Sequence, residues 1–281
     1  MSKSQPPGHT PKDSHYARLR RQHRASNAPA QQQGAPAALP DGQIHLYGLH
    51  TVRAALDNPK RTIVKLMATR NALQRLDLDE DGSALPFPLH IVQPKEIDAL
   101  TGADAVHQGV LAVAKVLEPK PLSAISDAKL VLVLDQVTDP HNVGAIMRSC
   151  VAFDADALVT TARHSPAESG VLAKAASGAL EHVNHITVRN LADALEELHG
   201  LGFQTIGLDS DGPNVLEATF AGERIALVLG AEGKGLRQKT RETVTALARL
   251  DMPGAIRSLN VSNATAIALY AANRHLGAGK A

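Results

Sequence analysis

Apolar runs and helical repeats alternate through the C-terminal half of this 281-residue chain. Short, continuous aliphatic runs are typical of strands buried on both faces, and apolar residues at helical spacing predict the helices between them. The expected strands are 131–134, 157–159, 185–189, 203–208 and 225–229. The expected helices are 142–153, 168–180, 191–200 and 260–275. This alternation predicts an α/β fold with a doubly wound parallel sheet, whose ligands bind at the carboxyl ends of strands.

A smaller α/β unit is expected before it, over residues 43–116. Its pattern predicts three strands and one helix, and the helix ends near Asn58 because Pro59 follows. The strands are 44–48, 61–68 and 109–116, and the helix is 49–57. Residues 117–128 contain two closely spaced prolines and are interpreted as a linker, which leaves 129–281 as the second domain.

The first part of the chain, residues 1–42, has a different composition. Its first forty residues hold six lysines and arginines against one aspartate, with many prolines and glutamines and few large apolar side chains. Such a segment buries too little to offset the entropy of ordering, so a disordered basic tail is expected. The cluster 18–24 suits phosphate contacts and a solubilising tail equally well.

Composition excludes several classes of protein. Seven aromatic residues, with no tryptophan, disfavour a protein that stacks many bases. Cys150 is the only cysteine, which excludes a disulfide framework and a cysteine zinc site. The thirteen histidines are scattered, and His182 and His185 lack companion ligands, so no metal is expected. No apolar run approaches the roughly 20 residues of a membrane span, and no secretory signal is seen; a soluble cytoplasmic protein without membrane contacts is expected.

Three polar loops hold the candidate chemistry, and the first two directly follow expected strands. In the first, Pro140 suits the first turn of a helix, and Asn142 and Arg148 follow it within that helix. The helix N–H groups and Arg148 could together hold a phosphate. Taken alone, the loop favours a structural role, in which Asn142 caps the helix and Arg148 forms a surface ion pair.

The second loop, residues 229–236, contains Gly230, Gly233 and Gly235. Their spacing differs from the dinucleotide-binding and phosphate-loop patterns, which disfavours NAD and ATP. Glycines this dense indicate close approach of the backbone to another group. Glu232 lies among them, either as a carboxylate of a site or as a residue whose charge caps the next helix.

The third loop, residues 250–263, bends at Pro253 and Gly254 and then crowds hydroxyl and amide side chains into a helix start. These are Ser258, Asn260, Ser262 and Asn263. Capping the helix needs one such residue, for which Ser258 is the simplest candidate. The surplus indicates a ligand.

In order and spacing, these loops resemble the three signature motifs of the SpoU (TrmH) family of RNA ribose 2′-O-methyltransferases. The matching segments are Asn142 to Arg148, Gly230 to Gly233 and Ser258 to Ser262. Residues 173–181 also resemble the family's linking segment, and 44–116, with Tyr47-Gly48 and His107-Gln108-Gly109-Val110, resemble its small RNA-recruiting domain. One departure is Asp251, where the family usually has proline before the methionine of the third motif.

The resemblance implies a methyltransferase domain with a trefoil knot, S-adenosylmethionine as cofactor, and a homodimer with its sites at the interface. It places Gly230, Leu250 and Leu259 against the cofactor. It assigns catalysis and substrate binding to a second group: Asn142, Arg148, Glu232, Ser258 and Asn260. The expected substrate is RNA, with a guanosine of the large ribosomal subunit's RNA favoured because a separate recruiting domain is present.

Methyl transfer to a ribose hydroxyl defines the task of these residues. A ribose hydroxyl is a poor nucleophile, so the enzyme must align it with the methyl group and stabilise the charge it develops. A guanidinium has a pKa above about 12 and is costly as a base. We therefore expect Arg148 to hold the adjacent phosphate and stabilise the alkoxide, while Ser258 and Asn260 orient the reacting groups.

Alternatives remain open at this stage. Transfer RNA is a second possible substrate, and a non-catalytic RNA-binding factor of the same fold is a second possible function. DNA is disfavoured because it lacks the 2′-hydroxyl. A nucleotide-dependent dehydrogenase or kinase is disfavoured by the glycine spacing.

Overall fold

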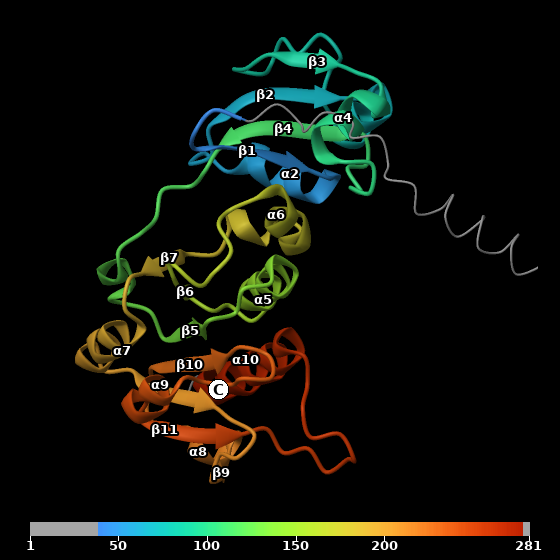
Figure 1. The fold of residues 1–281 in the computed structure, drawn as a ribbon. Coiled ribbons are helices and arrows are strands. Elements are labelled where there is room, and N and C mark those ends of the chain that lie inside the picture. The colour runs from blue at the N-terminus through green and yellow to red at the C-terminus, as the bar shows by residue number, and fades with distance from the viewer. Residues whose placement is uncertain (1–38, 278–281) are drawn as a thin grey trace, which may run out of the picture. The chain divides into compact units, whose positions relative to one another are not determined.

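Two β-sheets organise residues 39–277, the part of the chain that the computed structural model describes (Figure 1). The expectation of a disordered basic tail falls, up to residue 38, outside these residues. Within the described residues, no helix is both long enough and apolar enough to cross a bilayer.

The N-terminal domain is built on a four-stranded mixed sheet in the order β1-β4-β2-β3. β4 pairs antiparallel with β1 and β2, whereas β3 pairs parallel with β2. Its elements are β1 (Gln43–Tyr47), α2 (Leu49–Asp57), β2 (Ile63–Ala68), α3 (Arg70–Arg75), β3 (Leu89–Ile91), α4 (Pro94–Thr101) and β4 (Val110–Lys115). The three strands and the helix expected from the pattern are confirmed.

Sequence analysis missed α3, β3 and α4 in this domain. β3 is three residues long and follows the prolines at 86 and 88, so no alternation of apolar and polar residues marks it. α4 did carry a readable signal. Pro94 opens the helix, and Glu96 accepts a hydrogen bond from the backbone N–H of Gln93 in a capping box.

The C-terminal domain holds seven parallel strands in the order β7-β6-β5-β10-β8-β11-β9, which confirms the expected parallel α/β sheet. The strands are β5 (Leu130–Asp135), β6 (Ala157–Thr161), β7 (His185–Val188), β8 (Gln204–Leu208), β9 (Asn214–Val215), β10 (Ile225–Gly230) and β11 (Ala246–Arg249). The helices are η1 (Leu122–Ile125), α5 (Pro140–Ala152), α6 (Gly170–Ala176), η2 (Ala179–Glu181), α7 (Leu191–Gly200), α8 (Leu216–Thr219), α9 (Gln238–Thr243) and α10 (Val261–Gly277). The edge elements β9, α8, α9 and β11 were not expected from the sequence.

The central strand β5 shows why an unbroken aliphatic run forms here. Leu130, Leu132 and Leu134 belong to the core cluster shared with α5, α6 and α10, whereas Val131 and Val133 belong to the cluster shared with α7. Successive side chains of a strand point to opposite faces, so a strand covered on both sides must be apolar at every position.

Two expected helix boundaries were wrong. α5 begins at Pro140, and the side chain of Asp139 accepts a hydrogen bond from His141 N at 3.0 Å, so Asp139 rather than Asn142 caps the helix. The single helix expected over 168–180 is divided, because Ser177 adopts the left-handed conformation with φ 51°. A helix cannot continue through that conformation, and a short 3₁₀ turn follows instead.

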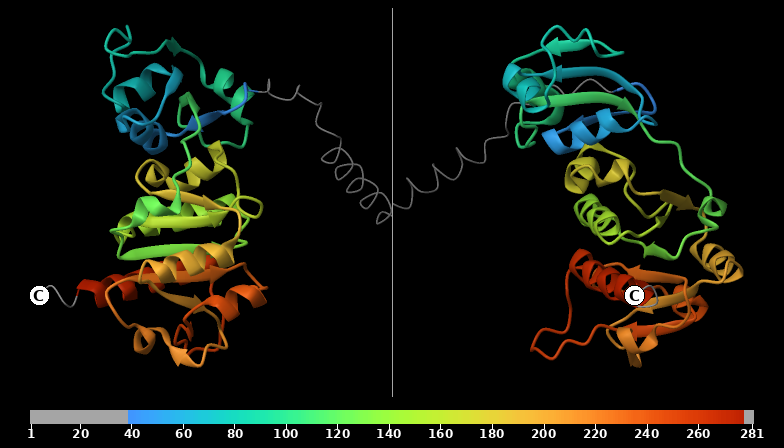
Figure 2. Two further views of the ribbon diagram at one scale, coloured as in Figure 1. Left: turned by 90° about the vertical axis from the view of Figure 1, so that its left-hand side faces the viewer. Right: turned by 180° about the vertical axis from the view of Figure 1, so that it is seen from behind.

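Strand order brings distant loops together. After β9 the chain returns to the centre of the sheet as β10, and it then moves outward again to β11. Loop 250–260 leads from β11 into α10, which packs against both β10 and α5 (Figure 2). The loops that follow β5, β10 and β11 therefore meet at the carboxyl ends of the strands.

Candidate functional site

The three motif loops meet through one carboxylate. Glu232 Oε1 accepts hydrogen bonds from Asn260 Nδ2 at 2.7 Å, from Asn142 Nδ2 at 3.2 Å and from Val261 N at 3.3 Å. Asn260 Nδ2 also donates to Asn142 Oδ1 at 3.0 Å. Residues separated by 118 positions thus form one cluster, and the three residues are among those that the family resemblance groups together.

Hydrogen bonding fixes the orientation of both amides in this cluster. An ionised carboxylate is only an acceptor, so each asparagine must turn its NH₂ group toward Glu232. Asn260 Oδ1 then accepts from Ser262 N at 2.8 Å and from Ser262 Oγ at 2.5 Å. Asn260, not Ser258, therefore caps α10, and Glu232 lies at the N-terminus of α10 rather than of α9.

Beside this cluster lies a cavity of about 270 Å³. Its walls come from the carboxyl ends of three neighbouring strands, β8, β10 and β11, and from the start of α10. Of the expected site residues, the lining includes Gly230, Glu232, Leu250, Ser258 and Leu259.

The composition of the walls suits the cofactor that the resemblance implies. Leu229, Leu250 and Val261 provide apolar surface for an adenine ring. Asp209 and Glu232 provide carboxylates on the same cavity, where the positive charge of a sulfonium or an amino group would be stabilised. The residues present therefore fit S-adenosylmethionine.

The glycine-rich loop folds back on itself. A Cβ at Gly230 would lie 2.1 Å from the carbonyl carbon of Gly235, a distance that no side chain tolerates. Gly235 N donates to the carbonyl oxygen of Ala231 at 2.9 Å and closes the turn. The group that the glycines approach is thus their own backbone, and this tight turn holds Glu232 beside the cavity.

An ion pair between a buried carboxylate and an exposed arginine anchors the far end of this loop. Asp135, the last residue of β5, is fully buried and accepts from Arg237 Nε at 2.6 Å and from Arg237 N at 3.0 Å. The pair joins the loop after β10 to the end of the neighbouring strand. Sequence analysis missed it, although an aspartate that ends an aliphatic strand is a readable signal of a polar partner.

Arg148 is the one expected site residue that lies apart from the others. It is exposed on α5, and no described residue forms a hydrogen bond or ion pair with it. Six residues of helix separate it from Asn142 by about 9 Å of rise and about 240° of rotation. Within one chain, Arg148 and the N–H groups at the start of α5 therefore do not hold one phosphate together, although the sequence had suggested that they could.

Several cavity residues were not among the expected site residues, including Asp209, Ser210, Met252 and Arg257. Asp209 follows β8 and forms an ion pair with Arg241 of α9. A position at the carboxyl end of an expected strand was the available signal. Cys150 is buried on α5, where burial raises the pKa of its thiol to about 12 and so keeps it protonated.

Comparison with known proteins matches both domains to families. Residues 129–270 match the SpoU rRNA Methylase family, and residues 45–120 match the family described as RNA 2'-O ribose methyltransferase substrate binding. A 23S rRNA (guanosine-2'-O-)-methyltransferase RlmB from Ralstonia nicotianae is 38% identical over 82% of this chain and 94% of its own length. The protein of that name from Coxiella burnetii is 34% identical, with the same coverage of each chain.

Solved structures agree on the fold. The SpoU methyltransferase AviRb from Streptomyces viridochromogenes superposes with a TM-score of 0.71 at 20% identity, over 85% of this chain and 91% of that one. An AdoMet-bound rRNA methyltransferase from Sinorhizobium meliloti gives a TM-score of 0.69 at 24% identity, over 84% of this chain and 88% of that one. At these identities the likeness concerns the arrangement of the two domains' elements.

Proposed function

Because the chain belongs to the SpoU rRNA methylase family, and is an S-adenosylmethionine-dependent RNA ribose 2′-O-methyltransferase, we propose that its substrate is a guanosine of 23S rRNA. The relatives named for that reaction align over most of their length, including both domains. The observation that carries the proposal is the Asn142–Glu232–Asn260 cluster on the rim of a cavity that suits the cofactor. A ribosomal substrate also makes a cytoplasmic location part of this proposal.

Gly230, Leu250 and Leu259 are proposed to hold the cofactor, since all three line the cavity. When bound, S-adenosylmethionine supplies a methyl group activated by its sulfonium. The protein has to exclude water from that methyl group and leave it open to the ribose 2′-oxygen alone. Leu259 lines the cavity and is 40% exposed, so its side chain is proposed to cover part of the bound cofactor.

Asn142, Glu232 and Asn260 are proposed to orient the ribose. Glu232 presets both amides, so that no reorganisation is needed when the substrate arrives. Ser258 lies on the wall of the same cavity as Glu232, and its hydroxyl group is proposed to help orient the reacting groups. Arg148 is proposed to bind the adjacent phosphate and stabilise the oxygen as its proton is lost.

We infer that a homodimer brings Arg148 to the site. Val151 lies three residues after Arg148 on α5 and shares its face. Ile267 and Tyr270, also three residues apart, form an exposed apolar face on α10, which packs against α5. The ring of Tyr270 contacts Phe153 with 5.9 Å between centroids, so the two exposed faces are continuous. Burying this surface against a second copy would place Arg148 at the partner's site.

Mixing two inactive variants tests this arrangement. If Arg148 acts across the interface, a heterodimer of Arg148→Ala and Glu232→Ala subunits contains one complete site. Random subunit exchange then restores about a quarter of wild-type activity. No recovery in mixtures shown to exchange subunits would place Arg148 in its own subunit's site, and a monomer by analytical ultracentrifugation would reject the dimer.

The substrate proposal is tested by mapping ribose methylation across total RNA with and without the protein. Loss of one 2′-O-methylguanosine in 23S rRNA is expected. Loss of a transfer RNA mark would replace the substrate. A protein that binds RNA but gives no heat with S-adenosylmethionine in calorimetry would be a non-catalytic factor.

A further inference from the structure

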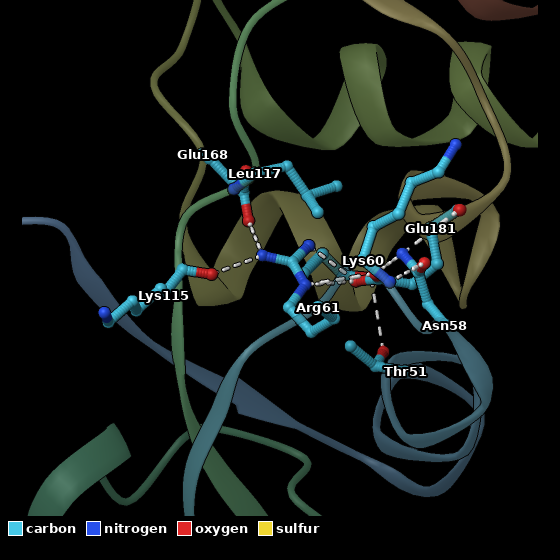
Figure 3. A network of polar contacts seen from close by, with 9 residues as sticks. Thr51, Asn58, Lys60, Arg61, Lys115, Leu117, Glu168 and Glu181 are labelled. Carbon is cyan, nitrogen blue, oxygen red and sulfur yellow. Dashed lines mark hydrogen bonds and ion pairs between the residues drawn. The ribbon is translucent and has the colours of Figure 1, made fainter.

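Arg61 of the N-terminal domain is enclosed by two carboxylates of the C-terminal domain (Figure 3). Its Nε donates to the two oxygens of Glu181 at 3.1 and 3.0 Å, and Nη2 donates to Oε1 at 2.6 Å. Nη1 donates to Glu168 Oε1 at 2.5 Å and to the carbonyl oxygen of Lys115 at 2.8 Å. The side chains of Arg61 and Glu181 are 0% and 1% exposed, so this contact is dry.

Both carboxylates also accept hydrogen bonds from residues near the ends of α2 and β4. Asn58 Nδ2 donates to Glu181 Oε2 at 2.8 Å, next to the end of α2. Leu117 N donates to Glu168 Oε2 at 3.0 Å, two residues after β4 ends. Glu168 therefore fixes the direction in which the chain leaves the N-terminal domain.

A second polar contact lies at the other end of α2. Lys174 Nζ, on α6, donates to Gln108 Oε1 at 2.9 Å, and the same oxygen accepts from Leu49 N at 3.2 Å. Between the two contacts, Thr51 Oγ1 donates to the carbonyl oxygen of Ala173 at 3.2 Å. The N-terminal domain is thus held along the whole length of α2, and α2 lies next to α6 in Figures 1 and 2.

Backbones also meet directly at this junction. A Cβ at Gly170, the first residue of α6, would lie 2.4 Å from the carbonyl oxygen of His45 and 2.6 Å from the ring of Tyr47. Leu49 and Val52 of α2 share one apolar cluster with Leu172 and Ala173 of α6. The contact is packed like the interior of a domain and is not a loose tether.

The same segment of the C-terminal domain lies against the catalytic helix. α6 packs on α5 where Gly144 meets it, and α5 carries Asn142 in its first turn. Replacing a buried ion pair by apolar residues is often neutral for stability. The hydrogen bonds of Arg61 to Glu168 and Glu181 are therefore better explained by the orientation of the N-terminal domain that they specify. One packed helix pair therefore separates the N-terminal domain from the catalytic cluster.

We propose that residues 168–181 form a docking platform for the N-terminal domain, and that Arg61, through Glu168 and Glu181, is a positioning residue for RNA methylation. Resting on the proposed function, in which the N-terminal domain binds the RNA, the platform sets a fixed distance between the recruited part of the RNA and the methylated ribose. The enzyme then selects RNA whose recognition element and target nucleotide match that distance. A freely tethered domain would accept many spacings.

The test uses the full chain and a neutral triple variant, Arg61→Gln with Glu168→Gln and Glu181→Gln, which leaves no unpaired buried charge. Small-angle scattering without RNA should show a larger maximum dimension than the wild type. The KM for RNA should rise about tenfold or more, while kcat at saturating RNA and the Kd for S-adenosylmethionine change less than about twofold. Arg61→Lys keeps the positive charge but loses the paired hydrogen bonds of the guanidinium. Its KM for RNA should lie between those of the wild type and the triple variant.

Two single variants complete the comparison. Lys174→Met loosens the second contact with little risk to folding and should raise the KM for RNA about threefold. Glu80→Gln is the matched control, since it removes an arginine-paired carboxylate of the N-terminal domain away from the platform and should leave the KM unchanged.

Several outcomes would overturn the proposal. If the triple variant has a larger maximum dimension but an unchanged KM for RNA, Arg61 has no positioning role. If its scattering profile equals that of the wild type, these charges do not hold the N-terminal domain on the docking platform. A fall in kcat or in cofactor binding at constant KM indicates a merely structural role. If the triple variant does not fold, an unchanged KM for Lys174→Met decides against the platform. If the wild type methylates an RNA other than 23S rRNA, the substrate proposal fails, and the same variants test the platform on that RNA.

Discussion

Glu232 is the residue on which the site's geometry depends most. A single oxygen of its carboxylate orients two asparagines from distant motifs and the first N–H of α10. The network lies near solvent, so its effect on folding is small compared with its effect on reactivity. A carboxylate in this position acts through the amides that it holds.

Glu232→Ala is expected to lower kcat by about tenfold or more, because Asn142 and Asn260 lose their shared acceptor. The free energy of unfolding should change by less than about 1 kcal/mol. Single-turnover methylation with labelled cofactor and urea denaturation measure the two quantities. Glu232→Gln keeps one acceptor oxygen and should retain more activity, and wild-type turnover in the alanine variant would refute the role assigned to Glu232.

Arg148→Lys tests whether the paired hydrogen bonds of the Arg148 guanidinium are needed. Lysine keeps the charge but cannot form paired hydrogen bonds with a phosphate, so kcat should fall at least about tenfold. The Kd for S-adenosylmethionine should stay constant, since Arg148 does not line the cavity. Near-normal turnover with intact RNA binding would show that the bidentate contact is not needed.

At the scale of elements, α5, the helix that carries Asn142 and Arg148, closely approaches α6. A Cβ at Gly144 would lie 2.5 Å from Ala175 Cβ and 2.8 Å from both Ala176 N and the carbonyl oxygen of Leu172. Two of these three atoms belong to the backbone, so no rotamer change relieves the overlap. Only glycine lets the two helices pack at this distance.

Gly144→Ala therefore sets two effects against each other. Alanine favours a helix by about 1 kcal/mol over glycine, whereas overpacking against backbone costs about 1–3 kcal/mol. The net expectation is a loss of about 1–2 kcal/mol in the free energy of unfolding, measured by urea denaturation. A stabilised variant would mean that α5 and α6 can move apart freely. The same displacement should lower kcat, because α5 carries Asn142.

At the scale of the molecule, two partly or largely buried histidines make stability depend on pH. Burial lowers the pKa of His185, whose Nε2 lies 2.9 Å from Thr160 Oγ1. Burial, with help from Lys65, also lowers the pKa of His45. Below the ordinary value of 6.5 the unfolded chain therefore binds more protons than the folded chain.

The free energy of unfolding should accordingly fall as the pH drops below about 6.5. Above that pH, the contribution of the two histidines to it should be constant. Denaturation curves across pH 5 to 8 measure this, and His185→Gln should flatten the slope. His90→Gln, at an exposed position of β3, is the control and should keep it. A slope that is the same with and without His185 would assign the pH dependence to other groups.

Sequence alone determined the parallel α/β sheet and pointed to the loops whose residues meet at Glu232. Aliphatic runs such as 131–134 are typical of strands covered on both faces, and polar residues directly after such strands lie where these sheets bind ligands. The contact of Asn142 with Asn260 follows from the order of the motifs once the family resemblance is accepted. These features are local, or repeat with a period that is visible in the chain.

Tertiary structure decided what depends on partners far apart in sequence. The Asp135–Arg237 pair and the enclosure of Arg61 by Glu168 and Glu181 each join positions about a hundred residues apart, and no local pattern distinguishes these charges from solvated ones. The position of Arg148, apart from Asn142 on their shared helix, follows from helical rotation and from where α5 lies. Pairing of buried charges is a property of packing, because it is burial that makes a partner obligatory.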